Sequence, residues 1–329
     1  MIRYCLLLVV LFVLPERPGF DAPVTQSERP PRVAVIGFTG NAKALTDLAV
    51  KEALARDTRV SIIDPDQVAA AVRGARYDGS INLSSEAARE LGAAVGCDFF
   101  VIGKAELVTR SDRENRSFVE ALIGVFIVDG RGGALVLFDF IAKQEASEEH
   151  AAKSAAEALR ERLSTYIDAL VQWGSSRRRG AQPSGEPAEE MPDENSPRRD
   201  GFKAPEFLNR VRPDYPDEAD RADISATVEA RAVLSSKGEI GEIEIIRWAG
   251  YGLEASAVRA IRQLKFTPAT RDGKPVSVRA VIRYNFRRSR GTDPITKEPE
   301  KKPPERDLRQ IFKTKLRPPT RGNGVRRWN

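Results

Sequence analysis

Strict alternation of apolar and polar residues over Ile224–Leu234 constrains the fold more than any other feature of this 329-residue sequence. Successive side chains of a strand point to opposite faces, so this period of two predicts a β-strand with one buried face. A second alternating segment, Val276–Tyr284, repeats the pattern. The sequence therefore predicts a sheet with one covered and one exposed face. The residues assigned to the covered face are Ile224, Ala226, Val228, Ala230, Ala232 and Leu234, then Val276, Val278, Ala280, Ile282 and Tyr284.

The region between these strands predicts a turn, a further strand and a helix. Ser236-Lys237-Gly238 is typical of a turn, and it leads into a strand-like run, Ile240–Arg247. Apolar residues then recur at three- and four-residue spacing over Leu253–Leu264, which predicts a helix with one apolar face. Arg271–Lys274 predicts a second turn. We therefore expect Pro205–Phe286 to form a small ββαβ domain with a three-stranded sheet and one helix.

The first half of the chain alternates between strand-like and helix-like segments. Asn41, Asp64 and Ser84 stand where each can cap a following helix. The order βαβαβ-ββ-α predicts an α/β domain, and the chain as a whole is expected to be of the α+β class. The predicted strands are Arg32–Phe38, Val60–Ile63, Asp98–Leu107, Phe118–Val128 and Ala134–Ile141; the longest predicted helix is Gln144–Trp173, and the helix after Asn41 is expected to bury Leu45, Leu48, Ala49 and Ala53.

The N-terminus has the features of an export signal. Arg3 supplies a positive charge, and Tyr4–Leu14 is an unbroken apolar run of 11 residues. As a helix this run would span about 16 Å, against about 30 Å for the hydrocarbon core of a membrane, which favours a signal segment over a transmembrane helix. Pro15–Gly19 lacks the pattern of a cleavage site, so an uncleaved anchor in the inner membrane stays open. We expect a periplasmic protein.

Composition divides the chain into five regions. The segment after the long helix is rich in Pro, Gly and balanced charges, which is typical of a flexible linker. From Arg287 to the end the chain carries 14 Lys/Arg and five Asp/Glu, so the net charge of +6 resides in a tail that we expect to be disordered. The regions are residues 1–31 (signal or anchor, and linker), 32–173 (first domain), 174–203 (flexible linker), 204–287 (second domain) and 288–329 (basic tail).

An ordered set of motifs in the second domain resembles the TonB C-terminal domain family and covers about a quarter of the chain. The individual residues also have structural reasons to be there: Tyr215 and Pro216 lead into the sheet, Gly238 and Gly273 allow turns, Phe266 packs at the helix exit and Pro268 stops continuation. The motifs are Pro213–Ala219, the strand Ala226–Leu234 ending at Lys237-Gly238, Gly252–Ala257, Phe266–Ala269, Asp272–Val276 and the closing strand to Phe286.

The resemblance implies that function lies at the edge of the sheet. The closing strand, Val276–Phe286, is expected to pair with an extended peptide from an outer-membrane receptor, because the unpaired N–H and C=O groups of an edge can accept another strand. Arg279 and Arg283 either favour an acidic partner or protect the edge from unwanted pairing. The implied partner-binding residues are Asn209, Arg210, Arg212, Asp214, Val278, Arg279, Ala280, Val281, Ile282, Arg283 and Tyr284.

Three features depart from an energy-transducing TonB. The apolar run is short and lacks Ser and His, no long Pro-rich spacer follows it, and a whole domain, Arg32–Trp173, stands in its place. These departures argue against coupling to inner-membrane motor proteins.

The first domain resembles the TolB N-terminal, CsgG and LpoB-like group of periplasmic adaptors. The residues that carry the resemblance are Val33–Phe38, Val60–Asp64, Leu91–Ala93 and Cys97–Lys104.

The sequence offers no constellation typical of an enzyme, and neither a metal nor a cofactor is expected. His150 is the single histidine, so a multi-histidine metal site is excluded. Cys97 is expected to be a small buried hydrophobe, and Gly37–Asn41 a structural turn without the Lys-Ser/Thr of a phosphate loop. The tail contains only Phe312 and Trp328 as aromatic residues, and together with export this argues against nucleic-acid binding.

These observations predict a non-enzymatic periplasmic adaptor of the TonB family that binds an outer-membrane protein by β-strand addition; whether it serves energised transmembrane transport, with inner-membrane motor proteins as further partners, stays open. The alternative is a non-energised scaffold for assembly of the cell envelope or for secretion.

Overall fold

The computed structural model describes residues 29–112, 114–178, 187–192 and 200–288, and all of these fall in one compact unit. The expected export signal, much of the expected linker and nearly all of the basic tail lie outside the described residues. Within the described ranges, no helix combines the length and the apolar character that a membrane crossing requires.

The first domain contains a five-stranded sheet in the order β2-β1-β3-β4-β5. Strand β1 runs parallel to β2 and β3, and β3, β4 and β5 form an antiparallel meander. The α+β class is confirmed, and the predicted order βαβαβ-ββ-α differs from the observed one in a single point, because two helices, α2 and α3, lie between β2 and β3. The elements are β1 Arg32–Thr39, α1 Lys43–Arg56, β2 Ser61–Ile62, α2 Pro65–Gly74, α3 Ser85–Val95, β3 Phe99–Ser111, β4 Ser117–Asp129, β5 Leu135–Glu145 and α4 Glu148–Arg178.

Two of the three predicted helix caps are confirmed. The Asp64 side chain accepts hydrogen bonds from two backbone N–H groups at the start of α2, and that of Ser84 accepts one at the start of α3. The prediction for Asn41 is wrong. Its side-chain amide instead exchanges two hydrogen bonds with the backbone of Leu107, at 2.7 and 3.1 Å, and thereby extends the pairing next to β3.

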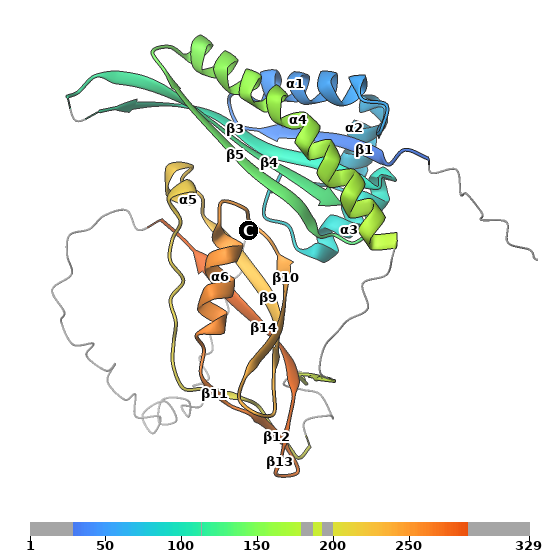
Figure 1. Cartoon of the computed structure of the whole chain (residues 1–329), viewed down its shortest axis with the longest axis vertical. Helices are drawn as coiled ribbons and strands as arrows, with labels where there is room; N and C mark the ends of the chain where they lie inside the picture. Colours follow the sequence, from blue (N-terminus) through green and yellow to red (C-terminus); the bar gives the residue numbers. More distant parts are fainter. Residues whose placement is uncertain (1–28, 113, 179–186, 193–199, 289–329) are drawn as a thin grey trace, which may run out of the picture. The chain divides into compact units, whose positions relative to one another are not determined.

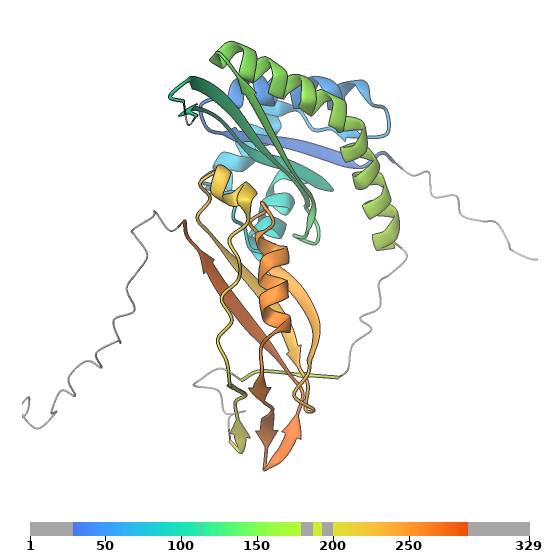
Figure 2. The same cartoon turned by 60° about the vertical axis from the view of Figure 1, so that its left-hand side comes forward.

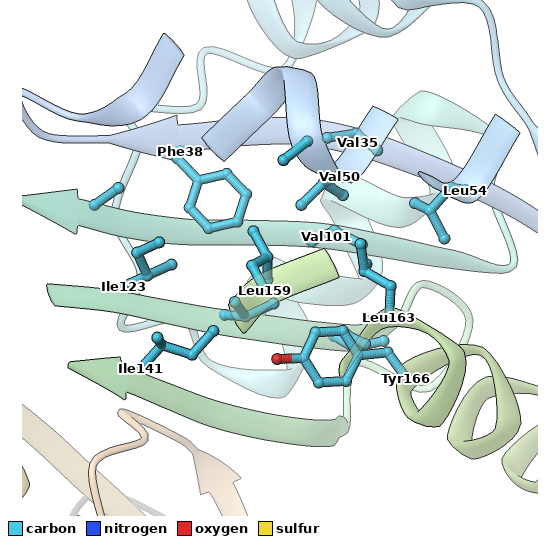
Figure 3. Close-up of a cluster of buried hydrophobic side chains, with 14 of the residues drawn as sticks. Val35, Phe38, Val50, Leu54, Val101, Ile123, Ile141, Leu159, Leu163 and Tyr166 are labelled. Atoms are coloured by element: carbon cyan, nitrogen blue, oxygen red, sulfur yellow. The ribbon is translucent and has the colours of Figure 1, made fainter. Parts of the chain in front are cut away.

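Helices α1 and α4 lie side by side over one face of this sheet (Figure 1). The sequence prediction for α1 was partly wrong, because Leu45 and Leu48 are more than half exposed while Thr46 and Val50 are buried. The buried stripe of α1 is therefore rotated by about one residue from the predicted one. Figure 3 shows the cluster where helices and sheet meet, with Val35, Phe38, Val50, Leu54, Val101, Ile123, Ile141, Leu159, Leu163 and Tyr166 labelled.

The second domain has the predicted ββαβ core, but its sheet has four strands, in the order β10-β9-β14-β6, where three were predicted. Helix α6 packs on one face of that sheet (Figure 2). The core elements are β9 Ala226–Leu234, β10 Ile240–Arg247, α6 Leu253–Arg262 and β14 Val278–Phe286. The additional short elements are β6 Glu189–Glu190, β7 Phe202–Lys203, β8 Glu206–Phe207, α5 Asp217–Arg221, β11 Phe266–Thr267, β12 Ala269–Arg271 and β13 Lys274–Val276.

The expected linker contains described residues with defined structure. Helix α4 continues to Arg178, β6 pairs with β14, and β7 pairs with β12. The boundaries drawn from composition therefore differ here from the elements that the structure contains.

The two domains share one hydrophobic cluster on the face of the first sheet opposite α1 and α4. Trp248 and Tyr251, from the loop between β10 and α6, are each 1% exposed. Ring centroids of Tyr251 and Phe138 lie 4.7 Å apart, and those of Trp248 and Phe126 lie 5.7 Å apart. The indole N–H of Trp248 also donates to the Gly133 carbonyl at 3.2 Å. Aromatic packing and one buried hydrogen bond thus join the domains.

Gly124 of β4 makes room for this contact. A Cβ at that position would lie 2.3 Å from the hydroxyl oxygen of Tyr251. Asn82 adds polar contacts from the loop before α3. Its amide donates to the carbonyls of Thr227 and Trp248 at 2.8 and 2.7 Å, and its oxygen accepts from the Thr227 N–H at 3.0 Å.

We predict that Trp248→Ala lowers the free energy of unfolding by about 3–5 kcal/mol, because it empties a fully buried aromatic site. Leu208→Ala, at a side chain that is 66% exposed, is the control and should change it by less than about 0.5 kcal/mol. Urea denaturation of the full chain measures both. Equal effects of the two substitutions would contradict the shared core.

Candidate functional site: the outer edge of strand β14

Strand β14 has one fully paired side and one largely open side. Its inner side pairs with β9 over the whole length, from Val278 opposite Leu234 to Phe286 opposite Ala226. Its outer side pairs with β6 only at Val278 and Arg279. Along residues 280–286, no strand among the described residues pairs with the outer side. We call this outer side the β14 edge.

The strand that occupies the start of the β14 edge runs parallel to β14. The Glu189 N–H donates to the carbonyl of Ser277 at 2.9 Å, and the Met191 N–H donates to that of Arg279 at 3.1 Å. N–H and C=O groups alternate sides along a strand. The odd-numbered residues from 277 onward therefore direct their backbone groups outward, and the even-numbered ones direct theirs toward β9.

Two arginines form ion pairs with the two glutamates of β6. The guanidinium of Arg271 on β12 lies 2.8 Å from the Glu189 carboxylate. Arg279 donates to the carbonyl of Ala188 at 3.2 Å, and its guanidinium lies 3.7 Å from the Glu190 carboxylate. Both carboxylates of β6 therefore lie beside a basic residue of the second domain.

Arg283 has its counter-charge within the sheet. Its Nε donates to Glu229 at 2.7 Å, and Glu229 stands directly opposite on β9. Arg279, in contrast, stands opposite Val233, so its acidic neighbour Glu190 comes from β6. The sequence analysis assigned the same role to Arg279 and Arg283, but their acidic neighbours come from different strands.

The remaining β14 residues of the predicted site divide by face. Val278 and Ala280 are buried in one apolar cluster of the core. Ile282 and Tyr284, on the same face of the strand, are half-buried in a second cluster that contains Ile261 of α6. Val281 is 52% exposed. Side-chain contacts with a partner would therefore come from exposed side chains of β14 such as Val281, whereas the buried and half-buried side chains hold the strand against the core.

The predicted segment Asn209–Asp214 runs along α6. Asn209 accepts from the Lys265 N–H at 2.7 Å and donates to the Gln263 carbonyl at 3.0 Å, just past the end of the helix. The Asp214 carbonyl accepts from the Ser256 hydroxyl at 2.6 Å. Arg210 and Arg212 are exposed. The geometry gives Asn209 and the Asp214 backbone a structural role, while the two arginines are accessible.

The family motif residues have the structural positions that the sequence suggested. The Tyr215 hydroxyl donates to the Ile224 carbonyl at 2.5 Å, and Pro216 precedes α5. Phe266 is buried, with its ring centroid 6.2 Å from that of Phe207. Gly238 and Gly273 have φ of +84° and +79°, which turns require, and Pro268 separates β11 from β12.

A buried carboxylate that the sequence analysis missed also joins the domains. Glu120 of β4 is 1% exposed. It receives hydrogen bonds from Arg221 of α5 and from Gln144 of β5, and it forms an ion pair with Arg110 of β3 at 2.6 Å. Burial raises the pKa of Glu120, but the hydrogen bonds from Arg221 and Gln144, together with the positive charges of Arg221 and Arg110, hold the pKa below its ordinary value. The sequence did contain a signal for this buried carboxylate, because Glu120 is a single acidic residue within the predicted apolar strand Phe118–Val128.

Other chemistry-bearing residues have local surroundings. Cys97 is buried, as predicted, and burial raises the pKa of its thiol to about 12. His150 lies one turn from Ser147 on an exposed helix start, with Nδ1 2.7 Å from the hydroxyl. The Phe38 N–H in the glycine-rich turn donates to Asp47 at 2.9 Å. In the part of the chain that the structure describes, no group of three or more acidic, His or Cys residues is arranged to hold a metal.

Comparison with known proteins finds a family match within the second domain. Residues 211–287 match the family described as "Gram-negative bacterial TonB protein C-terminal". The resemblance stated from the motifs is thereby confirmed for residues 211–287, which match a domain of a cell-envelope protein family. No curated protein sequence matches the chain.

Several solved structures are similar to parts of the chain. The TonB C-terminal domain of Pseudomonas aeruginosa is 21% identical over 31% of this chain and 98% of its own, with a TM-score of 0.24. The LpoB C-terminal domain from Salmonella enterica is 10% identical over 36% of this chain and 84% of its own, with a TM-score of 0.27. Lipoprotein GNA1162 from Neisseria meningitidis is 14% identical over 41% of this chain and 99% of its own, with a TM-score of 0.29.

We predict that Glu120→Gln destabilises the protein by about 3 kcal/mol at pH 7, because it leaves Arg110 and Arg221 without their buried counter-charge. The pKa of Glu120 is lowered in the folded state, so its contribution is complete above the unfolded pKa of about 4.3. It is lost as the pH falls through the lower folded value. Wild type and variant should therefore converge in stability only once the pH has fallen below the folded-state pKa of Glu120, which lies under its unfolded value.

Glu244→Gln is the matched control, since Glu244 is exposed and pairs with Arg231 on the surface at 3.0 Å. It should change stability by less than about 1 kcal/mol at any pH. Urea denaturation across a pH series measures both variants. A difference between wild type and Glu120→Gln that does not shrink on acidification would rule out the ionic origin.

Proposed function

We propose that this protein is a periplasmic cell-envelope adaptor whose second domain binds an extended segment of an outer-membrane protein by strand addition at the β14 edge. The observation that carries the proposal is that β6 already adds to this edge as a parallel strand, while the rest of the edge has no described partner strand. Backbone groups at such an edge form hydrogen bonds with an added strand, and side chains on the outward face supply specificity.

The family match supports the same reading, because residues 211–287 contain β9, β10, α6 and β14. The apolar run at residues 4–14 supports export to the periplasm, with attachment to the inner membrane if it is retained. In the energised version of this function, inner-membrane motor proteins would be further partners.

A non-energised scaffold for envelope assembly or secretion is the second candidate. The shared cluster around Trp248 and Tyr251 favours it, because the second domain is fastened to a folded neighbour. A domain at the end of a long free spacer would reach across the periplasm more easily than one so fastened. In the scaffold version the β14 edge would bind a component of the assembly machinery.

We predict that Val281→Pro abolishes partner binding without unfolding the domain. The Val281 N–H points outward, so proline removes a donor from the edge and leaves the pairing with β9 intact. In cells, a photoreactive residue at Asn285 should trap an outer-membrane protein in the wild type and in Val281→Ala. The trapped amount should fall at least tenfold in Val281→Pro.

A photoreactive residue at Glu242, on β10 at the opposite edge of the sheet, is the positional control. Trapping of the same proteins at both positions, or equal trapping in the proline and alanine variants, would overturn strand addition at β14. Trapping of assembly or secretion components alone, with the same loss in Val281→Pro, would move the assignment to the scaffold.

A further inference from the structure

The chain's own strand β6 occupies the first part of the β14 edge. We call β6 and its two flanking residues, Ala188–Met191, the internal strand. Its two backbone hydrogen bonds and the ion pairs of Glu189 and Glu190 with Arg271 and Arg279 reproduce what a bound peptide would form there. A strand addition site that holds a segment of its own chain shows what kind of strand it accepts.

We infer that the β14 edge selects a parallel strand with two consecutive acidic residues, and that the internal strand holds this position until such a partner displaces it. This inference rests on the proposed function, and it adds the chemical class of the partner and the competitor that the partner meets.

Charge is the first argument. Along β14, Arg283 is balanced by Glu229 on β9, whereas Arg279 faces Val233 and lies beside an acid supplied from outside the three-stranded core. Arg271 projects from β12 to the same segment and contacts Glu189. Two guanidinium groups at this end of the edge therefore favour carboxylates at adjacent positions of an added strand.

Length is the second argument. Pro187 and Pro192 bracket the internal strand, and proline is disfavoured within sheets. The internal strand accordingly pairs only with Val278 and Arg279. A partner strand without prolines can make the same contacts and continue along residues 281–285, whose outward backbone groups have no described partner strand. The partner thus gains contacts that the internal strand does not make.

Tethering is the third argument. The internal strand belongs to the same chain, so it competes at a fixed effective concentration whatever the protein concentration. Its contacts are few, and Glu189 and Glu190 are exposed, so their ion pairs are weak. The contact is therefore suited to displacement by a longer strand.

The test measures binding of labelled peptides to the full chain by fluorescence anisotropy. The acidic probe is Thr-Glu-Glu-Val-Thr-Val-Thr, and the matched neutral probe carries Gln-Gln in place of Glu-Glu. The double variant Glu189→Pro with Met191→Pro removes both backbone donors of the internal strand and leaves β14 unchanged. The acidic probe should bind this variant at least fivefold more tightly than it binds wild type.

Charge selection is tested on the same double variant. The acidic probe should bind at least fivefold more tightly than the neutral one; Arg279→Gln should weaken that preference, and Arg279→Gln combined with Arg271→Gln should remove it. Arg271→Glu combined with Arg279→Glu should reverse the preference toward a Lys-Lys probe, which is a gain that a misfolded protein would not show.

The outcomes separate the two levels of the proposal. Equal affinity of wild type and double variant, or equal affinity for acidic and neutral probes, would overturn this inference while leaving strand addition standing. Binding of no probe by the double variant would overturn strand addition itself. Binding that survives Val281→Pro would place the peptide elsewhere on the protein and would count against both.

Discussion

The packing of Trp248 and Tyr251 against the first sheet is the interaction on which the arrangement of the described chain depends. Strands β4 and β5 present apolar side chains on both faces, and α1 and α4 cover only one of them. The other face is covered partly by α2 and α3 and partly by the second domain. Each domain thus supplies apolar surface that the other buries, and neither core is complete alone.

The buried Glu120 favours one particular arrangement of the two domains over others with similar apolar contact. Apolar contact is tolerant of small shifts, but a carboxylate that is 1% exposed needs its partners in place. Arg110 and Gln144 come from the first domain and Arg221 from the second, so the charge is satisfied only when α5 lies where it does. The hydrogen bonds of Asn82 to Thr227 and Trp248 act in the same way.

Local pattern was sufficient to predict most elements, because each depends on neighbours close in sequence. The alternation at Ile224–Leu234, the caps at Asp64 and Ser84, and the turn at Gly273 were all readable from a few residues. The junction was not, because Trp248 and Phe126 are far apart in sequence. Its available signal was the unbroken apolar run of β4, which is typical of a strand covered on both faces.

The candidate site divides in the same way. The identity of the edge strand followed from alternation and from the family motifs, while the predicted role of its residues stays a prediction. What could not be foreseen was β6, since two glutamates between prolines have low strand propensity, and only Arg271 and Arg279 give them a reason to pair. The difference between Arg279 and Arg283 is likewise a matter of register, because a residue's cross-strand neighbour is fixed only once the strands are aligned.

Register also explains how the β14 edge can stay open without inviting unspecific pairing. An exposed edge is a liability, and charged side chains on it discourage wrong partners. Arg283 and Glu229 place a satisfied ion pair beside the open stretch, and the internal strand covers the part where Arg279 stands opposite Val233. A strand that lacks acids would leave Arg271 and Arg279 beside it without their present carboxylate neighbours. The features that protect the edge are therefore the same ones that would discriminate among its partners.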